Sequence, residues 1–325
     1  MKIAVDVMGG DYAPEEIIKG AILSLEKDSF EIVLLGDEDY ISKVLKEHDI
    51  NPDRISIVNC KNNIGSGEMP LIALKNKKDS SIVIGSKLVK QKQVDAFISA
   101  GNSGAVMAAA LLIIGCVEHI RRPAIATILP SLSGKVIILD VGANVDCKPK
   151  HLLQFSQIGS RYAKSILRKE NPTVGLLNIG EEENKGNDFS QKAYKILKEK
   201  CDNFHGNVEG KDVFKGKVDV VVCDGFTGNV LIKLSEGITK MLLLEIKDKI
   251  IDALPNNNEM NRLKNIFLEI VKRIDYKEIG GLPLLGINGY CFICHGRSKA
   301  KAIKNAIWNA VDFVNSDMLE QLRKI

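Results

Sequence analysis

Short apolar runs rich in valine and isoleucine alternate with amphipathic helical patterns along the whole chain, and this alternation constrains the fold most strongly. Most runs are continuously apolar, as expected for strands covered on both faces. The predicted strands are 2–7, 31–35, 55–58, 94–99, 124–129, 135–141, 174–178, 218–223 and 289–294. The predicted helices are 14–27, 38–48, 70–91 with a break near Asp79, 103–117, 151–169, 189–201, 228–253, 259–274 and 298–315. The pattern predicts an α/β fold with an open, doubly wound, largely parallel sheet.

Composition and charge exclude several classes of protein. The 325 residues are 45% hydrophobic and 26% charged, which is typical of a globular protein and not of a disordered or fibrous one. A net charge of +4 is too small for the dense basic surface of a nucleic-acid binder. The apolar stretch from Ala105 to Val117 is shorter than the roughly 20 residues of a membrane-spanning helix. The opening residues do not resemble a secretory signal, so we expect a cytoplasmic protein.

No linker rich in proline or serine divides the chain, so we expect one α/β domain over residues 1–325. The sharpest break lies at 255–258 and separates two long helical patterns, which predicts a protruding helical hairpin over 228–274. The first helix of this hairpin carries an apolar stripe wider than one partner face requires. A subunit interface explains this width, and so does contact of the hairpin tip with a membrane surface; the two are compatible.

Two turns after predicted strands share the pattern Gly-x-Ser/Thr-Gly, in SAGNSGA at 99–105 and in DGFTGNV at 224–230. Helix capping alone explains one such turn. Two of them, each placing free N–H groups at the positive end of a helix, favour an anion site. Neither turn matches the Walker or the dinucleotide-binding pattern. The candidate phosphate-binding residues are Asn102, Ser103, Gly104, Thr227 and Gly228.

Asparagines flank glycines at four predicted strand boundaries, and a lone histidine follows the last predicted strand. Turn formation and loop packing are the simplest explanations for each of them. Together, however, they can supply donors to an oxyanion. The candidate catalytic residues are therefore Asn144, Asn229, Asn288 and His295. The residues expected to orient donors and brace the loops are Asp6, Gly9, Gly10, Asp11, Asp140 and Asp224.

Cys291 to His295 fit the haem-attachment pattern C-x-x-C-H, which we reject because these residues read as a strand in a chain with no export signal. The two thiols should point to opposite faces of that strand, which also disfavours zinc. The chain contains no Gly-x-Ser-x-Gly elbow, and no Ser/His/Asp set can be assembled from it. Chemistry without a protein nucleophile is the better expectation.

Eight blocks of sequence, in order over nearly the whole chain, carry a specific resemblance. They are IAVDVMGGDYAP at 3–14, SAGNSGA at 99–105, RRPAIATILP at 121–130, LDVGAN at 139–144, NIGEEENKGN at 178–187, DGFTGNV at 224–230, GLPLLGING at 281–289 and HGRS at 295–298. Together they resemble the bacterial phosphate acyltransferases, the acyl-carrier-protein:phosphate acyltransferases of the PlsX family.

The resemblance implies an isopropylmalate-dehydrogenase-like α/β fold and a homodimer built through long helices. It implies transfer of a fatty acyl group from acyl-[acyl-carrier protein] to inorganic phosphate, which gives acyl-phosphate for phospholipid synthesis by a downstream glycerol-3-phosphate acyltransferase. It also implies peripheral association with the membrane. Phosphate is largely dianionic at neutral pH and a thiolate leaves readily, so direct attack needs no metal or cofactor.

Two further expectations concern substrate binding. The apolar stretch Leu282–Ile287 can line an acyl groove, and Lys299, Lys301 and Lys304 on one helix can meet an acidic carrier protein, although a solvated helix face is the simpler explanation. Two other functions stay open at this point. An oxidoreductase on the same fold would bind a nicotinamide cofactor, and a non-catalytic membrane adaptor would use the hairpin at 228–274.

Overall fold

The computed structural model describes residues 1–27, 29–48, 52–253, 262–263, 266–267, 269–271 and 280–325. The strands are β1 (Lys2–Asp6), β2 (Glu31–Gly36), β3 (Ile55–Asn59), β4 (Ala96–Ser99), β5 (Ala124–Ser131), β6 (Gly134–Leu139), β7 (Val174–Leu177), β8 (Phe204–Val208), β9 (Val220–Val222), β10 (Gly281–Leu285) and β11 (Tyr290–Cys294). In the described part of the chain they form one 11-stranded sheet in the order β3-β2-β1-β4-β11-β10-β5-β6-β9-β7-β8.

Helices cover both faces of this sheet. They are α1 (Glu15–Ser24), α2 (Glu38–Lys46), α3 (Pro70–Asn76), α4 (Ser81–Lys90), α5 (Ser103–Ala109), α6 (Pro149–Ser165), α7 (Asp188–Lys200), α8 (Gly210–Lys215), α9 (Gly225–Ala253), α11 (Ala300–Asn315) and α12 (Met318–Leu322). A 3₁₀ turn covers Pro52–Arg54, and a π-helical turn, Ala110–Ile114, continues α5. The predicted α/β class with a mostly parallel sheet is confirmed.

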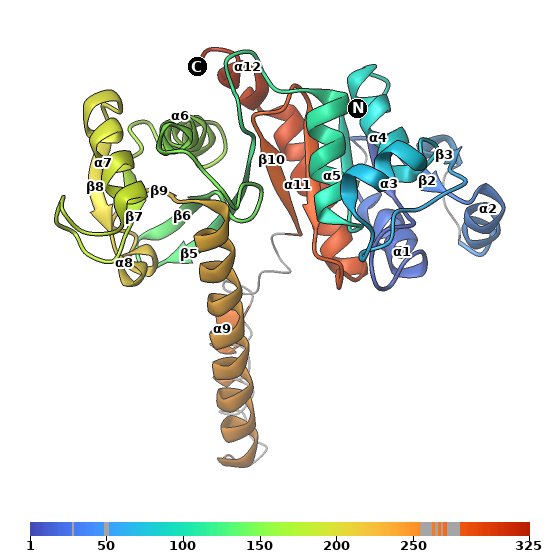
Figure 1. Cartoon of the computed structure of the whole chain (residues 1–325). Coiled ribbons are helices and arrows are strands. Elements are labelled where there is room, and N and C mark those ends of the chain that lie inside the picture. Colours follow the sequence, from blue (N-terminus) through green and yellow to red (C-terminus); the bar gives the residue numbers. More distant parts are fainter. Residues whose placement is uncertain (28, 49–51, 254–261, 264–265, 268, 272–279) are drawn as a thin grey trace.

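The sheet consists of two parallel halves that run in opposite directions. In the first half, β1, β2, β3, β4 and β11 are parallel, and in the second half β6, β7, β8 and β9 are parallel. The antiparallel strands β10 and β5 join the halves, and they pair only through Leu284 with Ile125 and Leu285 with Ala124. The two halves form separate lobes, and α9 leaves the molecule between them (Figure 1).

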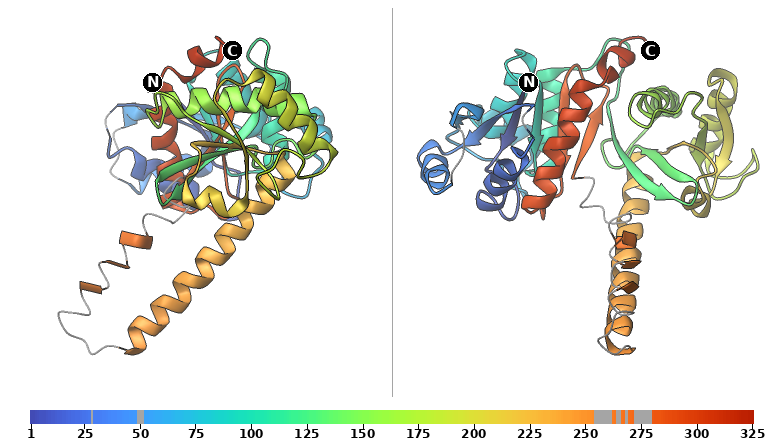
Figure 2. Two further views of the ribbon diagram at one scale, coloured as in Figure 1. Left: turned by 90° about the vertical axis from the view of Figure 1, so that its left-hand side faces the viewer. Right: turned by 180° about the vertical axis from the view of Figure 1, so that it is seen from behind.

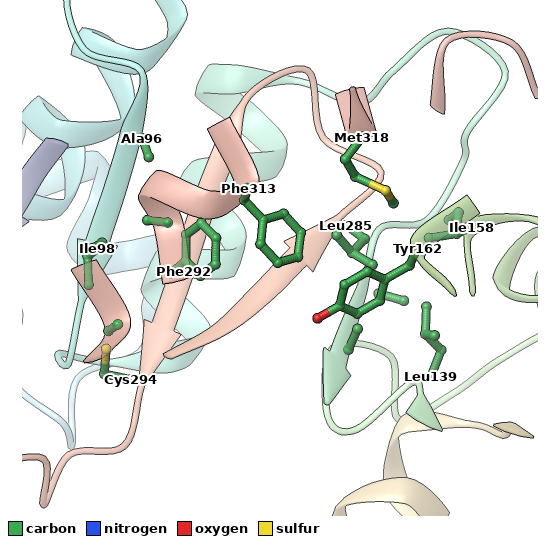
Figure 3. Close-up of a cluster of buried hydrophobic side chains, with 14 of the residues drawn as sticks. Ala96, Ile98, Leu139, Ile158, Tyr162, Leu285, Phe292, Cys294, Phe313 and Met318 are labelled. Carbon is green, nitrogen blue, oxygen red and sulfur yellow. The ribbon is translucent and has the colours of Figure 1, made fainter. Parts of the chain in front are cut away.

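Strands in the middle of the sheet are buried on both faces because their residues are apolar at successive positions. In β1 the side chains of Ile3 and Val5 join one buried cluster, whereas Ala4 joins the cluster on the opposite face. The first cluster extends across both lobes (Figure 3). Phe313 of α11 lies 5.2 Å from the ring of Tyr162 in α6 and 5.3 Å from the ring of Phe292 in β11. These aromatic contacts hold the lobes together beyond the short β10–β5 pairing.

Most sequence-predicted elements are present within a few residues of their expected ends, and the break near Asp79 separates α3 from α4. The sequence analysis missed the strands β8 and β10 and the short helices α8 and α12. Helix α9 is present as expected and projects from both lobes as a rod (Figure 2). The predicted second helix at 259–274 falls mostly outside the described residues, so the hairpin remains a prediction, as does the single domain.

Candidate active site

The carboxyl ends of β1, β4 and β11 lie side by side, and the residues that follow them form the first loop group, 7–12, 100–104 and 295–299. Asp6 at the end of β1 is buried and accepts hydrogen bonds from Ser99 Oγ at 2.6 Å and from the Met8 N–H at 3.1 Å. The Gly101 N–H in turn donates to Ser99 Oγ at 3.0 Å. Burial raises the pKa of Asp6 above its ordinary value. Asp6 therefore fastens two loops together from beneath.

Glycine is required where these loops touch. A Cβ atom on Gly9 would lie 2.6 Å from the backbone nitrogen of Gly101, and Gly10 has φ +112°, which favours glycine. The loops after β1 and β11 also meet, because the Asp11 N–H donates to the Gly296 carbonyl at 2.7 Å. Three candidates from the sequence, Gly9, Gly10 and Asp11, thus shape the first loop group.

His295, Arg297 and Lys299 are exposed polar side chains of the loop after β11, and the first two lie closest to Asp11 and α9. His295 Nδ1 accepts the Arg297 N–H at 3.1 Å, so the neutral ring carries its proton on Nε2. Nε2 has no hydrogen-bond partner in the described part of the chain. Arg297 Nε lies 3.9 Å from Asp11 Oδ2, but its side chain is 79% exposed, so this ion pair is weak. Both groups can therefore act on a ligand.

Asn102 has a structural task. Its Oδ1 caps α5 by accepting the Ala105 N–H at 3.0 Å, and its Nδ2 donates to the carbonyls of Gly65, Ser66 and Glu68. Its hydrogen-bonding capacity is used up within the protein, so the expected contact with phosphate has no free donor. The neighbouring Ser103 is exposed at the start of α5 and stays a candidate. A Cβ on Gly104 would lie 2.8 Å from Pro70, so this glycine lets α3 pack on α5.

The second loop group, 140–146 and 223–229, follows β6 and β9. Asp140 is fully buried, and its carboxylate accepts the backbone N–H groups of Ile125, Gly142, Ala143 and Asn144. Burial nevertheless raises the pKa of Asp140. Asn144 Nδ2 donates to Asp140 Oδ2 at 2.9 Å and to the Pro123 carbonyl at 2.8 Å. Both of its amide hydrogens are engaged, so Asn144 braces this loop and cannot donate to a substrate.

The start of α9 packs directly on this loop. Asp224 caps the helix by accepting the Thr227 N–H at 2.8 Å and the Thr227 hydroxyl at 2.7 Å. A Cβ on Gly228 would lie 1.9 Å from the carbonyl oxygen of Asp140, so only glycine fits there. Asn229 lies beside Gly142, and its side chain has no hydrogen-bond partner among the described residues. Asn229 is the one asparagine candidate whose amide is free and that also lies at a loop group.

Helix α9 begins in the second loop group, and one of its faces lies near His295 of the first. The residues Asn229, Lys233 and Glu236 are spaced i, i+4, i+7 and share one helix face. Glu236 lies about three turns beyond the start of α9. Burial raises the pKa of Glu236, whereas the nearby charges of His295 and Lys233 act to lower it, so this face of α9 lies within electrostatic reach of the first loop group.

The anion site predicted from the two Gly-x-Ser/Thr-Gly turns stays a prediction. Strands β6 and β9 run antiparallel to β1, β4 and β11, so the two helices follow strands of opposite direction. Among the described residues, no hydrogen bond joins the two loop groups, and the link between them runs through Glu236 and His295. Sequence reasoning missed Arg297, Lys233 and Glu236. The helical register from Asn229 could have revealed the last two.

Asn288 belongs to neither loop group. It lies in the turn between β10 and β11, at the opposite end of β11 from His295, and its Oδ1 accepts from Arg323 Nη2 at 2.9 Å. The expected acyl groove at Leu282–Ile287 stays a prediction. Leu284 and Leu285 are 2% and 3% exposed in strand β10 and belong to the core, whereas Leu282 is half-buried.

Two of the three lysines expected to meet a carrier protein already contact other side chains of this chain. Lys304 Nζ pairs with Glu26 at 2.6 Å, and Lys299 Nζ lies 4.9 Å from the ring centroid of Tyr12. These contacts tie the start of α11 to α1 and to the loop that precedes it. The α11 face is therefore used largely for packing within the chain.

None of the seven cysteines has an activated thiol. Burial raises the pKa of every one of them, to about 12 for the group Cys60, Cys147, Cys291 and Cys294. Cys291 and Cys294 belong to buried clusters on opposite faces of the sheet, which confirms the orientation expected from their spacing.

Solved structures of similar fold are enzymes. A phosphotransacetylase from Streptococcus pyogenes aligns with a TM-score of 0.69 at 16% identity and covers 97% of this chain and 94% of its own. 4-Hydroxythreonine-4-phosphate dehydrogenase from Klebsiella pneumoniae aligns with a TM-score of 0.52 at 14% identity and covers 96% and 99%. At these identities the likeness shows the fold alone. In the described part of the chain, no helix has both the length and the apolar character needed to cross a bilayer.

Curated relatives share far more sequence. The phosphate acyltransferase of Dictyoglomus turgidum is 49% identical and covers 100% of this chain and 98% of its own length. The phosphate acyltransferase of Desulfitobacterium hafniense strain DCB-2 is 48% identical and covers 100% and 97%. The family model described as fatty acid synthesis protein matches residues 1–321. The chain therefore belongs to the fatty acid synthesis protein family, the PlsX family that its sequence blocks resemble, and is an enzyme of the acyltransferase class.

Proposed function

We propose that the chain transfers a fatty acyl group from acyl-[acyl-carrier protein] to inorganic phosphate and so makes acyl-phosphate for phospholipid synthesis. The names of its relatives support phosphate as the acceptor, and the family description supports a place in lipid synthesis. The carrier-protein donor rests on the family resemblance of the sequence blocks, and the mechanism rests on the side chains of the two loop groups.

The proposal rests on two hydrogen-bond donors that have no partner among the described residues, one in each loop group. His295 Nε2–H belongs to the first loop group, and the Asn229 amide belongs to the second. Arg297 and Lys233 place two exposed cations on the same two elements. Such donors suit a reaction in which a dianion attacks a carbonyl group and negative charge develops on the carbonyl oxygen.

In the proposed step, a phosphate oxygen attacks the thioester carbonyl carbon and forms the C–O bond. The electron pair of the C=O bond moves to oxygen, where an N–H donor stabilises it. The C=O bond re-forms as the C–S bond breaks, and the sulfur departs with the electron pair of the C–S bond. The proton of hydrogen phosphate ends on sulfur, either directly or through His295: the imidazolium form of the ring gives its Nε2 proton to sulfur, and the neutral ring then takes the proton of the phosphate. The products are acyl-phosphate and the free thiol of the carrier protein.

The raised pKa values of the cysteine thiols support direct attack. A covalent acyl-enzyme on cysteine requires a thiolate near neutral pH, and burial disfavours that form in all seven cysteines. Positioning of two bound substrates is then the main task of the protein.

The exposed face of α9 supports a homodimer that also touches a membrane surface. Val230, Leu234, Ile238 and Met241 are between 46% and 59% exposed on this helix. An exposed apolar face of this extent is typical of a surface that binds another protein or a membrane. In the proposal, a second copy covers the part of α9 near the lobes, and lipid meets its far end. There the product can reach the glycerol-3-phosphate acyltransferase that consumes it.

The test combines purified protein, acyl-[acyl-carrier protein] and phosphate, with acyl-phosphate trapped by hydroxylamine as the hydroxamate. Product should form only when phosphate is present, in amounts equal to the carrier thiol released. Release of thiol without hydroxamate would identify a thioesterase and contradict the proposal. The variant Asn315→Ala, at an exposed asparagine near the end of α11, serves as a matched control with unchanged turnover.

A further inference from the structure

Four basic side chains gather beside the second loop group. Arg121 and Arg122 lie on the loop that enters β5, and Lys148 and Lys150 lie at the start of α6. We call these residues the basic cluster. In the described part of the chain none of the four has an acidic partner within 4.0 Å, in contrast to Lys304 on α11. All four are exposed.

Hydrogen bonds hold the two parts of this cluster together. Gln154 of α6 donates through Nε2 to the His119 carbonyl at 2.7 Å, and its Oε1 accepts the Arg121 N–H at 3.2 Å. Asn144 of the second loop group donates to the Pro123 carbonyl at 2.8 Å. The loop with the arginines is thus fastened both to the first turns of α6 and to the loop group.

The arrangement is unfavourable for the chain alone. Cations at a helix start oppose the helix dipole, and α6 has no acidic residue in its first turn. The charges also repel one another. Their combined field reaches His151, whose pKa is lowered by burial and by all four cations. A cluster of like charges that forms no ion pair within 4.0 Å among the described residues is suited to an external acidic partner.

We propose that the basic cluster is the docking surface for the acidic face of the carrier protein that brings the acyl thioester. This inference rests on the proposed function. The charges are spread over two exposed elements, with the apolar Val145 (59% exposed) close to them in the chain, which fits a protein surface better than a single small anion. The cluster also adjoins the loop on which Asn229 packs, so a docked carrier would present its thioester there.

The test is charge reversal. In Arg121→Glu/Lys150→Glu, the KM for acyl-[acyl-carrier protein] at low ionic strength should rise at least tenfold, with the KM for phosphate unchanged within twofold. The dissociation constant of fluorescently labelled holo-carrier protein, measured by anisotropy, should rise by the same factor. Added salt should weaken carrier binding to the parent protein and have little effect on the variant. The melting temperature should not fall, because repulsion is relieved.

Lys43→Glu/Lys46→Glu on α2, at the far edge of the sheet, makes the same change of charge and should leave the carrier KM unchanged. An unaltered carrier KM in the cluster variant would overturn the inference. So would a rise in the KM for phosphate instead, or weaker binding to anionic-lipid vesicles with carrier binding intact. If the parent protein makes no acyl-phosphate at all, the proposed function itself is wrong, and the inference falls with it.

Discussion

Replacement of Asn229 by alanine separates catalysis from stability. The Asn229 side chain has no hydrogen-bond partner among the described residues and lies about one van der Waals contact, 4.0 Å, from the Cβ position of Gly142. Its loss therefore breaks no internal hydrogen bond. Alanine is the better helix former by about 0.6 kcal/mol, which offsets the lost contact. We expect the free energy of unfolding to change by no more than about 0.5 kcal/mol.

Activity should change far more. If Asn229 donates to the phosphate or to the oxyanion only in the transition state, kcat/KM should fall about 100-fold, which corresponds to about 2.7 kcal/mol. Hydroxamate trapping measures the rate, and urea unfolding measures the stability. Full activity in Asn229→Ala would refute the role given to this residue. A large loss of stability would refute the claim that its side chain is free.

Asn144→Ala provides the contrast. Both amide hydrogens of Asn144 are engaged, with Asp140 Oδ2 and with the Pro123 carbonyl. Removing them leaves the Pro123 carbonyl without its side-chain donor, which costs about 1–3 kcal/mol, and takes from Asp140 one of the several hydrogen bonds that it accepts, which costs about 1 kcal/mol more. Stability and activity should fall together in this variant. An unchanged unfolding midpoint would contradict the bracing role of Asn144.

Three other outcomes are expected. His295→Gln keeps a hydrogen-bond donor but cannot transfer a proton, so kcat should fall by about 10²–10⁴ while the KM for phosphate stays unchanged. Steady-state kinetics at saturating carrier protein measure both constants, and an unchanged kcat would show that the imidazole has no catalytic role. Leu234→Glu places a carboxylate on the exposed face of α9 that the proposed dimer would bury, so the association constant measured by sedimentation should fall at least tenfold; an unchanged association constant would contradict an interface on this face. Burial raises the folded-state pKa of Asp6 above its ordinary value of 3.8, so the stability it contributes is present below that value and is lost as pH rises through the folded pKa. Asp6→Asn should remove this loss, so the urea midpoint of the variant should rise relative to that of the parent as the pH increases from 3.5. A constant difference between the two midpoints over this pH range would contradict the raised pKa of Asp6.

Strands could be predicted from the sequence where the apolar run is strong and unbroken, as in β1 and β6. Strands whose apolar run is interrupted could not be predicted. Strand β10 contains Pro283, and strand β8 contains Gly206, and both residue types argue against a strand in a single sequence. The two halves of the sheet run in opposite directions because of the antiparallel pairs that β10 and β5 make, so this reversal could not be predicted without β10.

The candidate site was predicted less completely, for a physical reason. Residue type shows what a side chain can donate, but not whether the protein already uses that donor. Asn102, Asn144 and Asn229 all follow the same pattern of asparagine beside glycine, yet only the last has a free amide. Glu236 belongs to no sequence motif, and its nearness to His295 depends on where the folded chain places α9 relative to the loop after β11.

Helix α9 is one continuous helix whose two opposite faces have different surroundings. One side bears Leu234, Ile238 and Met241, which face outward, and the other bears Glu236 within reach of His295. Backbone hydrogen bonds join each turn of an α-helix to the next, so a rotation or shift of one turn also moves its neighbours. In the proposed dimer, a partner that binds the outer side would therefore also set the position of Glu236, which links the proposed dimer contact to the environment of His295.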